Sequence, residues 1–130
     1  MKSQRVKKWM ERVDYDIKTA EAMLNTGRYI YAVFMWQQAI EKCFKALITY
    51  NDGDVLPIHN LRRLAELSGV IQEFSHEQLI KLDFLSQYYI NARYKEDISQ
   101  LSKGITNDIS QNLIDFSKEV IQWPAQKMKL

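Results

Sequence analysis

A narrow stripe of polar side chains crosses an otherwise apolar segment between residues 29 and 50. Gln38, Glu41 and Lys45 are spaced i, i+3, i+7, so they share one face of a helix. Inside a bundle such groups must either reach water or satisfy one another. They can form a buried network that fixes the register of the helices, or they can line a cleft in which the lysine meets a phosphate. The sequence leaves both interpretations open.

Arg93 is the second candidate, because it stands where the apolar repeat of its segment requires a hydrophobic side chain. An arginine in that place must pair with an acid or face a cleft or a partner. Its forked donors suit a phosphate, and we expect Glu41 to orient them, with Tyr94 at the same site. The alternative is a structural ion pair between Arg93 and Glu41 or Glu96.

The chain has two histidines, and neither is near Arg93 in the sequence. Metal-independent RNA cleavage needs groups that remove and return a proton, and an imidazole with its ordinary pKa of about 6.5 suits both tasks. His59 begins the third helical segment and is able to approach the cleft, although a histidine there more often bonds to backbone. His76, in the first turn of the next segment, lies about 25 Å from Arg93 along a helix.

Amphipathic helices are expected to position these residues. Apolar side chains recur every three or four positions in four long segments and one short one, and no segment alternates as a strand would. We predict a first helix that ends near Gly27, a second over about 28–50, a third from about His59 to Gly69, a fourth that starts at a Ser75/Gln78 capping box, and a fifth from about 106.

These segments predict an all-α, up-and-down bundle of four to five helices that forms one domain over residues 1–130. Residues 94–104 are polar and lose the helical period, so we expect a loop or a loose helical turn there. Pro124 is expected to mark the end of the last helix or a kink in it.

Charge, cysteine content and motifs limit the possible functions to different degrees. The net charge of +2 neither demands nor excludes a nucleic-acid partner, and the basic residues before residue 13 suit either a solvated helix end or a phosphate backbone. The single Cys43 indicates a reducing, cytoplasmic setting, and no apolar run reaches the ~20 residues of a membrane span. Neither a glycine-rich phosphate loop nor a metal-ligand spacing occurs, so we expect no cofactor and no metal.

Four sequence features, in their order and spacing, resemble the HEPN domain, a family of small helical proteins. They are Trp9, the run 38–47, His59-Asn60-Leu61 and the run 88–94. The resemblance spans roughly residues 9–94 and extends more loosely into the last helix. It implies a homodimer with a nucleotide- or RNA-facing cleft near the fourth helix, and a minimal nucleotidyltransferase as partner or antitoxin.

The family's catalytic signature is an arginine followed, after four to six residues, by a histidine. Arg93 matches the arginine, but the corresponding histidine positions are Ile98, Ser99 and Gln100. None of these side chains can transfer a proton near neutral pH. The resemblance therefore implies a protein that binds nucleotide or RNA phosphate without being a competent nuclease. Its site residues would be Arg93, Tyr94, Gln38, Glu41, Lys45 and His59.

Two alternatives remain. One is a metal-independent endoribonuclease toxin that uses Arg93 with His59, or with a histidine of a partner chain, as its catalytic groups. The other is a non-catalytic helical adaptor, in which the polar stripe only specifies the geometry of the dimer.

Overall fold

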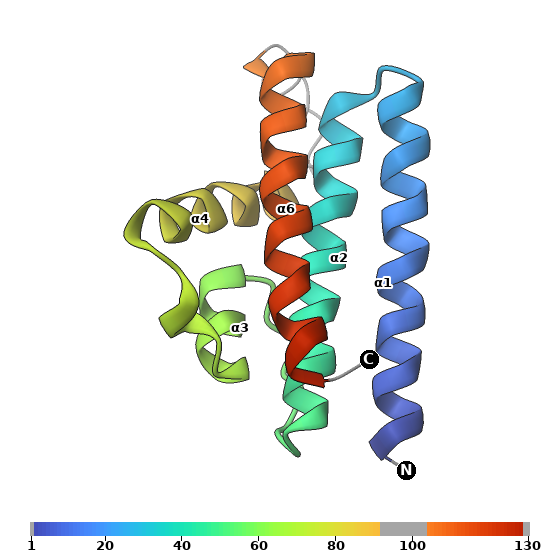
Figure 1. The fold of residues 1–130 in the computed structure, drawn as a ribbon. Coiled ribbons are helices and arrows are strands. Elements are labelled where there is room, and N and C mark those ends of the chain that lie inside the picture. Colours follow the sequence, from blue (N-terminus) through green and yellow to red (C-terminus); the bar gives the residue numbers. More distant parts are fainter. Residues whose placement is uncertain (1, 92–103, 129–130) are drawn as a thin grey trace.

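The computed structural model describes residues 2–91 and 104–128, and it begins with a long antiparallel pair of helices (Figure 1). Helix α1 (Lys2–Asn25) and helix α2 (Tyr29–Tyr50) are joined at Gly27, whose φ of 78° is left-handed. Glycine adopts this conformation without steric cost. The boundaries predicted near residues 27, 28 and 50 are confirmed to within two residues.

A short segment leads from α2 to helix α3 (Leu61–Ser68), which ends in a left-handed Gly69. The Asn60 side chain caps α3 by accepting from the Arg63 backbone N–H at 2.9 Å, so the helix begins after His59 and not at it. A 3-10 turn, η1 (Ile71–Glu73), which the sequence did not indicate, connects α3 to helix α4 (His76–Asn91).

The predicted capping box at the start of α4 is confirmed. The Ser75 hydroxyl accepts from the Gln78 N–H at 3.1 Å, and the Gln78 side chain accepts from the Ser75 N–H at 2.8 Å. Two exposed backbone donors are thereby satisfied at once.

The last helix, α6 (Asn107–Met128), continues through Pro124, so the expectation that it ends there is wrong. Proline offers no N–H to the carbonyl four residues earlier. Pro124 and Met128 are nevertheless buried, and burial of their apolar surface offsets the cost of the missing hydrogen bond. The loop or loose turn expected at 94–104 falls almost entirely outside the described residues.

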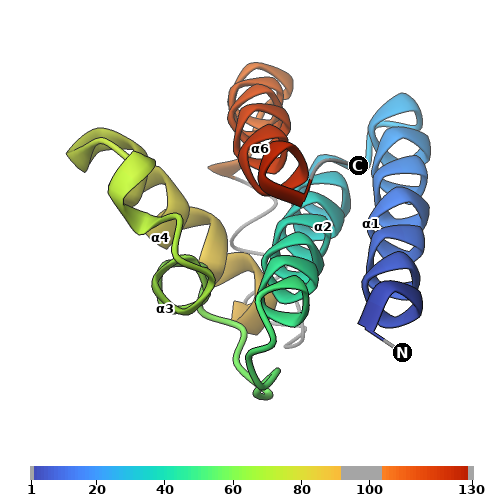
Figure 2. The same ribbon diagram turned by 60° about the horizontal axis from the view of Figure 1, so that its bottom comes forward.

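Helix α2 is central to the bundle and contacts α1, α3, α4 and α6 (Figures 1 and 2). Helix α1 runs antiparallel to α2, whereas α6 runs in the same direction as α2. Helices α3 and α4 lie on the side of α2 away from α1, and α4 crosses the long helices at a steep angle. The prediction of an all-α bundle is confirmed, and none of the described residues forms a strand.

The core explains why α2 is so apolar. Ile40, Phe44 and Leu47 are fully buried, and Phe74 bridges α2 to α6 by edge-on ring contacts with Phe44 and Trp123. Leu67 of α3 and Ile109 of α6 lie within the apolar repeats of their segments, which predicts burial, but both remain 39% exposed. Among the described helices, none is both long and apolar enough to cross a bilayer.

Candidate functional site

The polar stripe on α2 is a column of buried side chains. Gln37, Glu41, Lys45 and Thr49 follow one another at intervals of four and are at most 6% exposed. An interval of four places side chains one above another along a helix. The buried column therefore includes Gln37, which the sequence interpretation had passed over in favour of Gln38.

The carboxylate of Glu41 is the centre of this column. Lys45 Nζ donates to its Oε2 at 3.0 Å, and Gln37 Nε2 donates to its Oε1 at 3.3 Å. His59 Nδ1 lies 3.1 Å from both oxygens. A carboxylate offers about four lone-pair sites, so these partners occupy most of its capacity. We call Gln37, Glu41, Lys45 and His59 the buried network.

His59 brings the network to the surface. Its side chain is 37% exposed, while that of Glu41 is 5% exposed. Asn60 takes the capping role before α3, which leaves the imidazole of His59 to face Glu41. The His59 carbonyl also accepts from Gln37 Nε2 at 3.4 Å, so both its backbone and its ring are held against α2.

A hollow of about 300 Å³ lies beside His59. Its other lining residues are Asn60, Asp83, Ser86 and Gln87, so the segment before α3 and the middle of α4 enclose it. Two contacts fix these walls. Ser86 Oγ accepts from the Leu61 N–H at 2.8 Å, and the Asp83 carboxylate accepts two hydrogen bonds from Arg62, at 3.0 and 2.8 Å.

Four of the six expected site residues are thus brought together by the structure. Glu41, Lys45 and His59 are in direct contact, and Gln38 joins them through a 2.7 Å hydrogen bond from its Nε2 to Gln37 Oε1. The other two, Arg93 and Tyr94, lie outside the described residues, as do positions 98–100. In the sequence, Arg93 follows the last residue of α4 by two positions.

Reasoning from the sequence missed Gln37 and the α4 residues of the hollow. The series 37, 41, 45, 49 would have identified Gln37, because residues four apart share a helix face. No comparable signal identifies Ser86 or Asp83. Their roles depend on how α3 and α4 cross, which sequence spacing does not fix.

Metal binding and thiol chemistry find no support in the described ranges 2–91 and 104–128. They contain no group of three or more His, Cys, Asp or Glu side chains that could hold a metal ion. Cys43 is buried against α6, and burial raises the pKa of its thiol to about 12, so the thiol stays protonated. A protonated, inaccessible thiol is a poor nucleophile.

Comparisons with known proteins agree with this architecture. The model of a protein family described as the HEPN domain matches residues 6–128. The crystal structure of TT1696 from Thermus thermophilus superposes with a TM-score of 0.76 at 22% identity and covers 95% of this chain and 98% of the other. That of ST0689, an archaeal HEPN homologue, gives 0.73 at 20% identity over 95% and 97%. None of the curated proteins matches significantly.

Proposed function

We propose that this chain, which belongs to the HEPN domain family, binds nucleotide or RNA phosphate and acts with a minimal nucleotidyltransferase partner in a toxin–antitoxin-like pair. In this proposal the chain forms a homodimer, works in the cytoplasm and does not itself cleave RNA. Arg93 binds the phosphate and Tyr94 stacks on a base. The missing histidine at residues 98–100 is the reason for assigning binding without cleavage.

The observation that carries the proposal is the buried network beside an open polar hollow. Burying a carboxylate and an ammonium is a poor way to stabilise a fold, because well-packed apolar residues do as well or better. Here the buried charges extend to the half-exposed His59, at the edge of a hollow of about 300 Å³. Such an arrangement supports ligand binding, since it fixes a polar side chain where a ligand can reach it.

The carboxylates around the hollow are paired with cations. Asp83, the one acid among the described lining residues, already accepts two hydrogen bonds from Arg62. Lys45 neutralises Glu41 from inside the bundle. With both carboxylates paired, a phosphate meets less repulsion there than it would beside free acids.

A titration of the Arg93→Ala variant tests the proposal. We expect its affinity for AMP and for a short RNA to fall at least tenfold, because charge-assisted hydrogen bonds contribute about 1.5–3 kcal/mol. Arg63→Ala is the matched control, since Arg63 is an exposed arginine that pairs with Glu66 on α3. Equal affinities for the wild type and Arg93→Ala would contradict the proposal.

One contact favours a second candidate function, a metal-independent endoribonuclease. A carboxylate 3.1 Å from the Nδ1 of a half-exposed histidine is the arrangement that orients a general base. In this alternative the purified protein cleaves RNA in the presence of a chelator, His59→Ala abolishes the cleavage, and His76→Ala does not. No cleavage by the wild type over a broad pH range would eliminate it.

The dimer and its partner are tested separately. If the stripe only sets dimer geometry, Glu41→Gln and Arg93→Gln should convert a dimer to a monomer in light scattering, whereas our proposal expects the dimer to survive both changes. Co-expression provides the partner test, in which a minimal nucleotidyltransferase encoded beside this chain should co-purify with it.

A further inference from the structure

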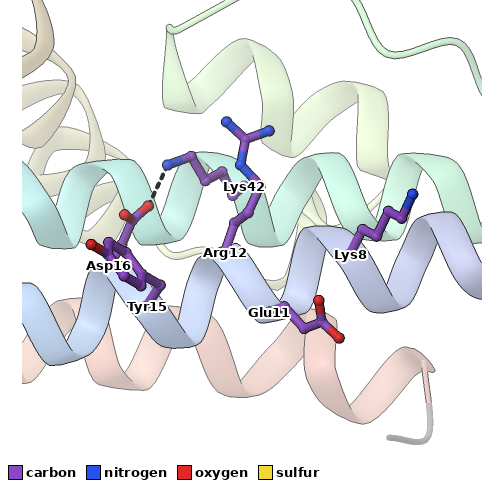
Figure 3. Close-up of a pocket in the computed structure, with 6 residues that line it drawn as sticks. All are labelled: Lys8, Glu11, Arg12, Tyr15, Asp16 and Lys42. Atoms are coloured by element: carbon purple, nitrogen blue, oxygen red, sulfur yellow. Dashed lines mark hydrogen bonds and ion pairs between the residues drawn. The ribbon is translucent and has the colours of Figure 1, made fainter.

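A second hollow, of about 650 Å³, opens between α1 and α2 (Figure 3). Its lining residues are Lys8, Glu11, Arg12, Tyr15, Asp16 and Lys42, and we call it the α1 groove. It shares no lining residue with the hollow beside His59. The buried network therefore does not account for it.

An ion pair between helices forms part of the groove. Lys42 of α2 donates to Asp16 of α1, and the side chains are only 14% and 6% exposed. Because this pair is neutral as a unit, the cations left to meet a ligand are Lys8 and Arg12. Both project to the same side of α1, whereas Glu11 points away from them (Figure 3).

The positive charge of the chain is concentrated at this end of α1. The first twelve residues contain five basic side chains and one acidic one, which gives +4, while the whole chain carries +2 and the remainder therefore −2. The first turn of α1 contains no acid. Lys2, in that turn, pairs with Asp52 and lies over the Tyr50 ring, whereas Lys8 and Arg12 line the groove.

Tyr15 supplies an aromatic surface at the edge of the groove. It is 73% exposed and follows Arg12 by three residues, and both residues line the groove. Arg12 is itself held over the Trp9 ring, 5.3 Å from its centroid. An exposed ring beside positioned cations is the combination with which proteins hold single-stranded nucleic acid.

We propose that the α1 groove binds a single strand of nucleic acid, with Lys8 and Arg12 on successive phosphates and Tyr15 stacked on a base. The contacts involve phosphates and base faces, so the site accepts RNA and DNA without sequence preference. An acidic protein segment would use the cations but would gain nothing from Tyr15. This proposal stands apart from the proposed function, because the two sites have no residue in common.

Anisotropy titrations with a labelled 12-nucleotide oligouridine and its oligothymidine counterpart test the groove. Lys8→Gln/Arg12→Gln should weaken binding of both strands at least tenfold. It should also reduce the slope of log affinity against log salt by about 1.4, or about 0.7 for each lost phosphate contact. Tyr15→Ala should weaken binding about tenfold with the slope unchanged, and Tyr15→Phe should bind like the wild type.

The matched control is Lys7→Gln/Lys118→Gln, which removes the same charge from exposed positions outside the groove. It should reduce affinity less than threefold. All variants are repeated in the Arg93→Ala background. The losses of affinity caused by the groove variants should be the same there, whether or not Arg93 binds a phosphate. The proposal is overturned if neither strand binds, or if the control loses as much affinity as the groove variant. It is also overturned if Tyr15→Ala has no effect, because the strand would then bind without stacking on Tyr15.

Discussion

The two polar regions on either side of α2 use the same kind of ion pair for different ends. In the buried network, Lys45 and Glu41 belong to one helix, and the carboxylate is shared with Gln37 and His59. In the α1 groove, Lys42 and Asp16 join two helices and leave neighbouring cations in water. The comparison teaches that a buried charge with several partners fixes the positions of those partners, whereas exposed cations can contact a ligand directly.

Among substitutions in these two polar regions, Glu41→Gln should produce the largest loss of stability. It leaves the ammonium of Lys45 buried without its counter-charge, so we expect the free energy of unfolding to fall by about 3–5 kcal/mol. Urea denaturation measures this. Glu11→Gln, an exposed acid of the α1 groove, should change stability by less than about 0.5 kcal/mol. Similar values for the two variants would invalidate the comparison.

Asp16→Asn should have the next largest effect, a loss of about 2 kcal/mol. The amide keeps one acceptor for Lys42 but removes the charge of a nearly buried pair. A double-mutant cycle with Lys42→Met isolates the interaction. We expect the double variant to lose clearly less unfolding free energy than the two single variants lose together. Simple additivity would mean that the pair does not join α1 to α2.

Much of this fold follows from the sequence, and the reason is local. The left-handed Gly27 and Gly69, the Ser75/Gln78 box and the apolar repeat of α2 act within a few residues, so spacing alone reveals them. The sequence left an end or a kink at Pro124 as alternatives, because the continuation of α6 through Pro124 depends on burial against other helices. The contact of His59 with Glu41, eighteen residues away, likewise depends on the path of the chain before α3.

Cys43 gives a smaller, pH-dependent readout of the α1 side of α2. Its pKa is about 12 in the folded protein against an ordinary value of 9.0, and burial is the cause. The folded state thus favours the protonated thiol. That contribution to stability is complete below pH 9 and is lost as the pH rises toward 12. Cys43→Ala should therefore lose less stability than the wild type between pH 9 and 11 in matched thermal melts.

The rate of Cys43 labelling tests whether the ion pair between Lys42 and Asp16 holds α1 against α2. At pH 8 the folded wild type should react with a thiol reagent far more slowly than the unfolded chain. Cys43 clusters with Val13 of α1 and Ile114 of α6, so Asp16→Asn should accelerate labelling by loosening α1. An unchanged rate in that variant would show that the ion pair does not hold α1 in place.

The smallest effect on stability is expected from Lys8→Gln/Arg12→Gln, at most about 0.5 kcal/mol in either direction. Both side chains are exposed, and neither belongs to a buried pair. Denaturation of this variant beside Glu41→Gln sharpens the contrast, because the groove variant should lose nucleic-acid affinity and keep its fold. A large loss of stability would assign these cations a structural role.

The most direct test of the central claim is calorimetric titration of AMP and of a 12-nucleotide RNA, with chelator present, into the wild type and Arg93→Ala. The account predicts that the wild type binds both and leaves the RNA intact, and that Arg93→Ala binds AMP at least tenfold more weakly. AMP affinity that does not change on removal of this guanidinium would contradict it.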